Sequence, residues 1–161
     1  LYLYMMTHPG KKLNFMGNEL AMFREWDEKR ELDWDLLKMP AHDSFHHYIK
    51  QLNKQYLKHQ AIWELDHTYD GFKWVDCKSD NKCVFAFTRT CKKNNVLIIL
   101  NFSDKEATIS PKLEGKVTLL LNTDWEVFGG KTVKSIKKKV PQTLPPFTGI
   151  LFTYQKSTAS K

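Results

Sequence analysis

Three histidines, His42, His46 and His47, lie close together with Asp43 between them. Imidazole and carboxylate groups hold a metal ion only when they converge on one point. Neighbouring positions on a helix point about 100° apart, so His46 and His47 cannot both face one ion. The sequence also lacks H-E-x-x-H, G-x-S-x-G and a glycine-rich phosphate loop. We therefore expect no metal, no cofactor and no nucleophilic centre in this chain.

Aromatic residues carry a clearer signal. A ring beside polar groups can stack on the apolar C–H face of a sugar while its neighbours bind the hydroxyls. Trp74 stands in a strand-like stretch with polar neighbours, and Phe45 opens a helical stretch. Each is a candidate sugar platform, and for each the alternative is packing between the helix and the β domain. Trp63 and Trp125 are expected in the core.

The segment around Phe45 has helical periodicity. Its apolar residues recur at i, i+3, i+4, i+7 and i+11, which places them on one face of a helix over residues 44–59. Asp43 or Ser44 is the expected N-terminal cap. The stripe consists of Phe45, Tyr48, Ile49, Leu52 and Tyr56.

From residue 71 onward the apolar residues follow a period of two, as in strands. Short strands at regular spacing, separated by turn residues, are typical of an antiparallel β sandwich. We therefore predict a mainly β fold for residues 63–161. The predicted strands are 72–77, 83–89, 96–102, 107–110, 117–121 and 149–154.

The first part of the chain has a different pattern. We expect the tail of a helix over residues 1–7, a short strand over 12–17 and a charged loop over 18–42. A lone strand flanked by helices has no sheet to join. Residues 1–62 are therefore expected to be the end of a larger parallel structure, cut from a longer chain that precedes them.

The overall composition excludes several classes of function. The formal net charge is +7, but the lysines are scattered, whereas a nucleic-acid surface needs clustered basic residues with interleaved aromatics. No apolar run approaches the roughly 18 residues of a membrane span. Three cysteines without a signal peptide argue against a disulfide framework. We expect a cytoplasmic protein that binds neither nucleic acid nor membrane.

An ordered set of short motifs resembles the glycogen (1,4-α-glucan) branching enzymes, which belong to the amylase-type glycoside hydrolases. The resemblance covers nearly the whole chain and is strongest up to Trp74. It is the combination that is specific, because any one motif alone is weak. The motifs lie at residues 9–19, 24–26, 32–34, 46–47, 64–66, 71–74, 121–124 and 144–146.

The resemblance implies that residues 9–19 are the eighth strand of a (β/α)8 barrel and that 46–47 open its eighth helix. A C-terminal all-β domain would follow. The implied activity of the parent enzyme is cleavage of an α-1,4-glucan chain and its reattachment through an α-1,6 bond, by a retaining mechanism with a carboxylate nucleophile and a carboxylic acid. A third carboxylate would support the transition state. In the family these three residues come from strands four, five and seven, so they lie upstream and this chain alone is expected to be inactive.

Barrel active sites lie at the C-terminal ends of the strands, so the loop after Gly17 is expected to border the site. The resemblance implies an α-glucan partner such as glycogen or a maltooligosaccharide, together with the missing barrel. The alternative for Arg24 and Glu25 is a local ion pair that braces the loop. The loop candidates are Asn18, Glu19, Arg24, Glu25, Trp26 and Asp27, and the substrate-binding candidates of the chain are Trp74, Phe45, Trp26, Glu19 and Arg24.

Two functions of different classes fit these features. The first is a C-terminal part of a branching enzyme with a scaffold or glucan-contact role. The second is a free-standing carbohydrate-binding module. A free-standing binding module would not retain an isolated strand between two helices, so these features favour the first function.

Overall fold

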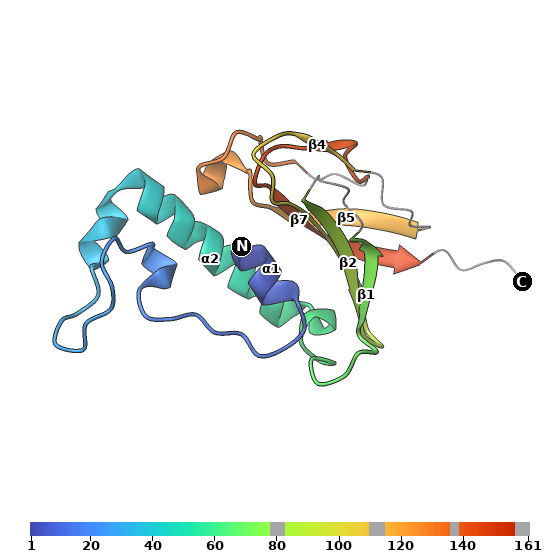
Figure 1. Ribbon diagram of the computed structural model, residues 1–161, viewed down its shortest axis with the longest axis horizontal. Helices are drawn as coiled ribbons and strands as arrows, with labels where there is room; N and C mark the ends of the chain where they lie inside the picture. Colours follow the sequence, from blue (N-terminus) through green and yellow to red (C-terminus); the bar gives the residue numbers. More distant parts are fainter. Residues whose placement is uncertain (78–82, 110–114, 136–138, 157–161) are drawn as a thin grey trace, which may run out of the picture.

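The computed structural model describes residues 1–77, 83–109, 115–135 and 139–156. Its first part is helical and its second part is built of strands (Figure 1). The helical elements are α1 (Tyr2–Thr7), η1 (Asn18–Leu20), η2 (Trp34–Lys38), α2 (Pro40–Lys58), η3 (Gln60–Ile62) and η4 (Glu126–Phe128). The strands are β1 (Phe72–Asp76), β2 (Val84–Thr90), β3 (Asn95–Asn101), β4 (Ala107–Thr108), β5 (Gly115–Asn122), β6 (Thr143–Leu144) and β7 (Gly149–Lys156).

Five strands form one antiparallel sheet in the order β1-β2-β3-β7-β5, and β4 and β6 form a second, two-stranded sheet. The predicted mainly β fold with an antiparallel sandwich is therefore confirmed. All six predicted strands are present within a few residues of their expected bounds, although Ser110, at the end of the fourth, lies outside the described residues. The sequence reasoning missed β6, because two residues are too few to show a period.

The sheet is buried on both faces, which explains its near-continuous apolar strands. In β3, Val96, Ile98 and Leu100 face the helices, whereas Leu97 and Ile99 face the small sheet. These alternate directions follow from the period of two. In β5 the register shifts between Leu119 and Leu121, and the residues on either side of the shift pack on opposite faces.

Helices α1 and α2 lie side by side against one face of the large sheet (Figure 1). The apolar stripe of α2 is confirmed, since Tyr48, Ile49 and Leu52 are buried and Phe45 and Tyr56 pack at the edge of the same cluster. Leu3 and Met6 of α1 join them. The helices and the sheet therefore share one hydrophobic core.

The short strand predicted over residues 12–17 is wrong. Residues 12–17 belong to none of the described strands or sheets, and a strand needs a neighbour for its backbone hydrogen bonds. The helix predicted from residue 44 begins earlier, at Pro40, with Met39 in place of the expected Asp43 or Ser44 cap. Proline is favoured in the first helical turn because its fixed φ suits a helix and its missing N–H costs nothing there.

The predicted loop 18–42 is also more structured than expected, since it contains η1, η2 and the first residues of α2. Trp63, expected in the core, is 36% exposed, whereas Trp125 is buried as expected. The short helix η3 gives the inward positions to Ala61 and Ile62. Successive residues of a 3₁₀ helix point about 120° apart, so Trp63 turns outward.

Candidate functional site

The loop between α1 and α2 encloses a cleft of about 470 Å³. Four of the predicted loop residues line it: Asn18, Arg24, Glu25 and Trp26. The chain reverses here at Gly17, whose φ of 84° is left-handed. Glycine adopts this conformation freely, and a β-carbon at this position would lie 2.2 Å from Sδ of Met22. The reversal therefore depends on glycine.

Trp26 is the most open aromatic residue among the predicted site residues, with 39% of its surface exposed. Its ring packs edge-on against Phe15, with centroids 5.7 Å apart and planes at 73°. Phe15 also lines the cleft. The indole is thus supported from one side while part of it stays open, as stacking on a sugar requires.

Arg24 braces the loop through Asp33. Its Nε lies 3.1 and 3.0 Å from the two carboxylate oxygens of Asp33, and its Nη2 lies 2.9 Å from Oδ1. Nη2 also donates to the carbonyl of Glu31 at 2.7 Å. The expected local bracing is present, but the carboxylate is that of Asp33, and Glu25 contributes only its carbonyl oxygen. Most N–H donors of Arg24 are therefore engaged within the loop.

Glu19 lies beside the cleft and is not part of its lining. Its carboxylate accepts a hydrogen bond from Nδ2 of Asn14 at 2.9 Å. Burial, together with the nearby negative charge of Glu19, raises the pKa of the Tyr2 hydroxyl. Glu19 is therefore held on the side of the loop that faces α1.

Trp74 lies in β1, an edge strand of the large sheet, and is 38% exposed. Three phenylalanine rings support its indole, those of Phe72, Phe87 and Phe85, at centroid distances of 5.1, 5.5 and 6.2 Å. These three contacts hold the indole in place without burying it. The exposed part of the indole is free to stack on a sugar.

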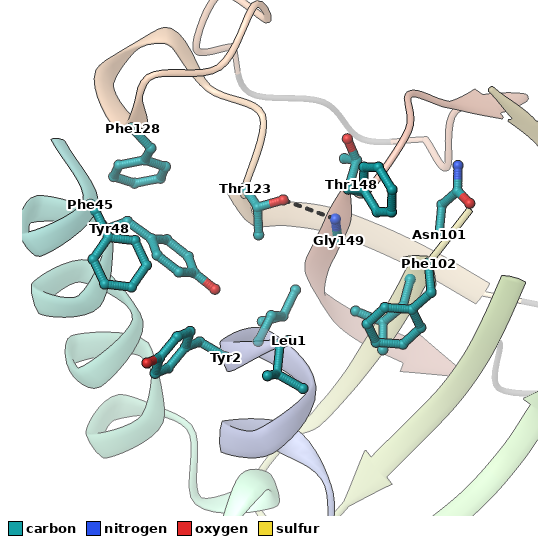
Figure 2. A pocket seen from close by; sticks show the side chains of 13 residues that line it. Leu1, Tyr2, Phe45, Tyr48, Asn101, Phe102, Thr123, Phe128, Thr148 and Gly149 are labelled. Carbon is teal, nitrogen blue, oxygen red and sulfur yellow. Dashed lines mark hydrogen bonds between the residues drawn. The ribbon is translucent and has the colours of Figure 1, made fainter. Parts of the chain in front are cut away.

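Phe45 lines a separate pocket of about 240 Å³ between the helices and the sheet (Figure 2). Its ring meets Tyr2 edge-on at 5.4 Å and lies 6.1 Å from Tyr48. Polar groups on the opposite wall are already engaged, since Thr123 Oγ1 accepts a hydrogen bond from the Gly149 N–H at 2.9 Å. The pocket therefore offers aromatic surface more than free hydrogen-bonding groups.

The structure brings some predicted site residues together and keeps others apart. Arg24 and Trp26 share the loop cleft, Phe45 lines the second pocket, and Trp74 is in neither lining. Sequence reasoning missed Phe15 and Asp33 as the supports of the loop. The sequence feature that could have revealed Asp33 is its place as the one acidic residue of the motif at 32–34, close enough along the chain to pair with Arg24.

Two of the histidines near the start of α2 form hydrogen bonds to the loop. His42 Nδ1 lies 2.8 Å from the carbonyl of Leu20, and His46 Nδ1 lies 3.1 Å from that of Glu19. Within the described ranges, no group of three or more His, Cys, Asp or Glu is arranged to hold a metal ion. No helix in the described part of the chain has the length and apolar character to cross a membrane.

This arrangement of a β sandwich behind two helices has a clear family assignment. The model of the "Alpha amylase, C-terminal all-beta domain" family matches residues 74–155, and the chain belongs to that family. The chain is also similar to bacterial proteins named 1,4-alpha-glucan branching enzyme GlgB. It is 44% identical to the one from Oceanobacillus iheyensis over 135 residues, which cover 81% of this chain and 21% of that protein.

The relative from Bacillus caldolyticus is 38% identical over 154 residues, covering 92% of this chain and 23% of that protein. The chain therefore spans about a fifth to a quarter of the length of the curated relatives it matches. The predicted resemblance to a C-terminal part of a glycogen branching enzyme is confirmed by these similarities.

Solved structures agree on the fold. A pullulanase from Anoxybacillus sp. LM18-11, complexed with maltotetraose, superposes with a TM-score of 0.64 at 12% identity and covers 94% of this chain and 22% of its own. An inactive double mutant of MutB in complex with isomaltulose gives a TM-score of 0.60 at 11% identity, covering 95% of this chain and 37% of its own. At such identities the likeness extends to the fold alone.

Proposed function

We propose that this chain is the C-terminal part of a 1,4-α-glucan branching enzyme of glycogen biosynthesis, which forms α-1,6 branches by transferring α-1,4-glucan chains. The observation that carries the proposal is the 44% identity to a GlgB protein over 81% of the chain. Residues 1–62 would be the end of the catalytic barrel and residues 63–161 its C-terminal β domain. The enzyme would act in the cytoplasm.

The chain itself would serve as a scaffold. Buried Arg89 of β2 donates to Asp66 at 2.6 Å and to the carbonyl of Thr7 at 3.0 Å. Lys12 reaches the same Asp66 at 3.5 Å and donates to the carbonyl of Gly10. These bonds join the segment that follows α1 to the sheet. A β domain tied in this way would hold the last barrel elements in place.

The chain would also contact the glucan. Trp74 and Trp26 are both about two-fifths exposed and each rests on other aromatic rings. Separate weak contacts along one polymer raise its overall affinity by increasing the effective concentration of the next segment. Phe45, Glu19 and Arg24 would have supporting roles, since their side chains are partly engaged inside the protein.

Catalysis would require the rest of the enzyme. A retaining mechanism needs two carboxyl groups about 5 Å apart on either side of the scissile bond. In the cleft, Glu25 is the acidic residue of the lining, and Asp33 is held by Arg24. We expect the isolated chain to leave amylose unchanged.

The test compares the isolated chain with the same chain fused to the upstream barrel of a GlgB relative. Branching is followed by the iodine absorbance shift of amylose, and binding by retention in a glycogen gel. The proposal predicts branching only by the fusion and weak retention of the isolated chain, with Kd no tighter than about millimolar. Tight glycogen binding by the chain alone, with no gain of branching on fusion, would instead favour a free-standing binding module.

A further inference from the structure

Two histidines on one face of α2 bind neighbouring carbonyls of the loop. His42 Nδ1 lies 2.8 Å from Leu20 O and His46 Nδ1 lies 3.1 Å from Glu19 O. Residues four apart on a helix lie one above the other, which explains how both rings reach the same turn. Because a carbonyl oxygen only accepts, each Nδ1 must carry the proton.

The turn that they bind needs outside support. The last carbonyls of a helix lack donors from the helix itself, and η1 ends at Leu20. The next residue, Ala21, has a left-handed φ of 52°, which is unfavourable for a residue with a β-carbon. The two imidazole N–H groups satisfy the carbonyls just before this strained position.

A third contact comes from the loop itself. The Phe23 ring packs edge-on against the His42 ring, with centroids 4.9 Å apart and planes at 81°. His42 is buried, and Leu20 is completely buried beneath the turn. Phe23 also lines the cleft with Trp26. The position of the cleft wall therefore depends on where the histidines hold η1.

We propose that His42 and His46 are positioning residues of the loop cleft, which we call the histidine clamp. They act through the carbonyls of Glu19 and Leu20 and hold residues 17–26 in the shape that presents Trp26 to an α-glucan. The ligand assignment rests on the proposed glucan contact, whereas the clamp itself stands on the two hydrogen bonds.

The first experiment needs no sugar. Long-range ¹⁵N NMR identifies the protonated nitrogen of each imidazole, and the clamp requires Nδ1–H for both His42 and His46. Amide hydrogen exchange then follows residues 17–26 in His46→Leu and His46→Asn. Asparagine places its amide the same number of bonds from the backbone as Nδ1. We expect exchange in the loop to rise about tenfold in His46→Leu, as the loss of one hydrogen bond allows, and to stay near wild type in His46→Asn.

The matched control is His47→Leu. His47 is exposed on the same helix turn, and its ring lies 5.7 Å from Phe128 instead of reaching the loop. This variant should leave exchange of residues 17–26 unchanged. For the buried partner, His42→Asn should preserve slow exchange better than His42→Gln, whose amide lies one bond further out.

The second experiment adds maltoheptaose and follows the indole N–H resonances of Trp26 and Trp74. The clamp predicts that His46→Leu weakens the apparent affinity reported by Trp26 by up to about tenfold, the limit that the loss of one hydrogen bond sets. The Trp74 response should not change, and His46→Asn should restore the Trp26 response. A general loss of folding would move both resonances and would not be rescued.

The outcomes separate the two proposals. Protonation of Nε2 in place of Nδ1, or unchanged loop exchange in His46→Leu, would overturn the clamp whatever the sugar does. If the Trp26 resonance of the wild-type protein does not shift on addition of maltoheptaose, the proposed glucan contact at the cleft is wrong. The exchange pattern measured without sugar still decides whether the histidines hold the loop.

Discussion

Arg89 of β2 and Asp66 of the segment before β1 form an ion pair in which Nη2 lies 2.6 Å from Oδ1. Arg89 is completely buried, and its Nε and Nη1 donate to the carbonyls of Gly71 and Thr7. Burial lowers the pKa of Lys12, the second cation of this network, despite the opposing attraction of Asp66. The carboxylate of Asp66 thus neutralises charge that has little access to water.

The first prediction is that Asp66→Asn destabilises the protein by about 3–5 kcal/mol, because it leaves the buried charge of Arg89 uncompensated. Urea unfolding followed by circular dichroism measures this loss. Lys38→Met is the control, since Lys38 pairs with Asp35 on the exposed surface at 2.6 Å. Similar unfolding midpoints for the two variants would contradict the importance of the buried pair.

The second prediction compares two leucines of α2. Leu52 is 1% exposed within the core, whereas Leu57 is 73% exposed. Leu52→Ala should cost about 2–5 kcal/mol through lost burial and the cavity that it leaves. Leu57→Ala should change the free energy of unfolding by no more than about 0.5 kcal/mol. Chemical denaturation of both variants checks whether the helix packs on the sheet as described, and equal costs would argue against it.

The third prediction concerns Trp74. Trp74→Ala should remove the contribution of this ring to maltoheptaose binding, and it should cost less stability than the about 3–5 kcal/mol of a buried aromatic residue. Trp63→Ala is a matched control, because Trp63 has nearly the same exposure, 36% against 38%. Isothermal titration and thermal unfolding give the two quantities. A large drop in Tm with unchanged sugar affinity would assign Trp74 to the core.

The fourth prediction is a pH dependence carried by His59. Burial, with a smaller contribution from the charge of Lys58, lowers the pKa of this histidine. The folded protein therefore binds the His59 proton less readily than the unfolded chain, whose histidines titrate near about pH 6.5. The resulting stability is present above that pH and is lost as the pH falls through it toward the lower folded pKa.

Urea midpoints between about pH 8 and pH 5 test this, since the range spans the titration of an ordinary histidine. His59→Leu should flatten the decline on the acidic side, and His67→Gln, at an exposed position, should not. An equally steep decline in His59→Leu would assign the acid sensitivity to another group.

Local periodicity was sufficient to predict the elements that pack. The α2 stripe from Phe45 to Tyr56 and the six predicted strands were found because burial of one face imposes a period on the sequence. The strand predicted over residues 12–17 is absent from the structure. A strand is stabilised by a neighbour, and the pattern of one segment carries no information about whether that neighbour is present.

The candidate site was only partly predictable. The loop candidates were chosen from the resemblance and from the position of barrel active sites at strand ends. Their alternative, a pair between Arg24 and Glu25, misplaced the partner of Arg24 by eight positions, since that partner is Asp33. Residues adjacent in sequence were assumed to pair, whereas the loop folds back and brings residue 33 to the guanidinium. The contacts of His42 and His46 with Leu20 and Glu19 could be recognised only from the fold.

By itself, the sequence determined the class of fold, the face of α2 that is buried and the family to which the chain belongs. These properties depend on the local periodicity and on the order of the motifs, and both can be read from the sequence alone. Only the tertiary structure decided that Trp74 stays partly exposed while it packs against three phenylalanine rings. The same holds for the ion pair between buried Arg89 and Asp66. Such contacts join residues distant in the chain, and the direction of each side chain is set by packing around it, which no local pattern encodes.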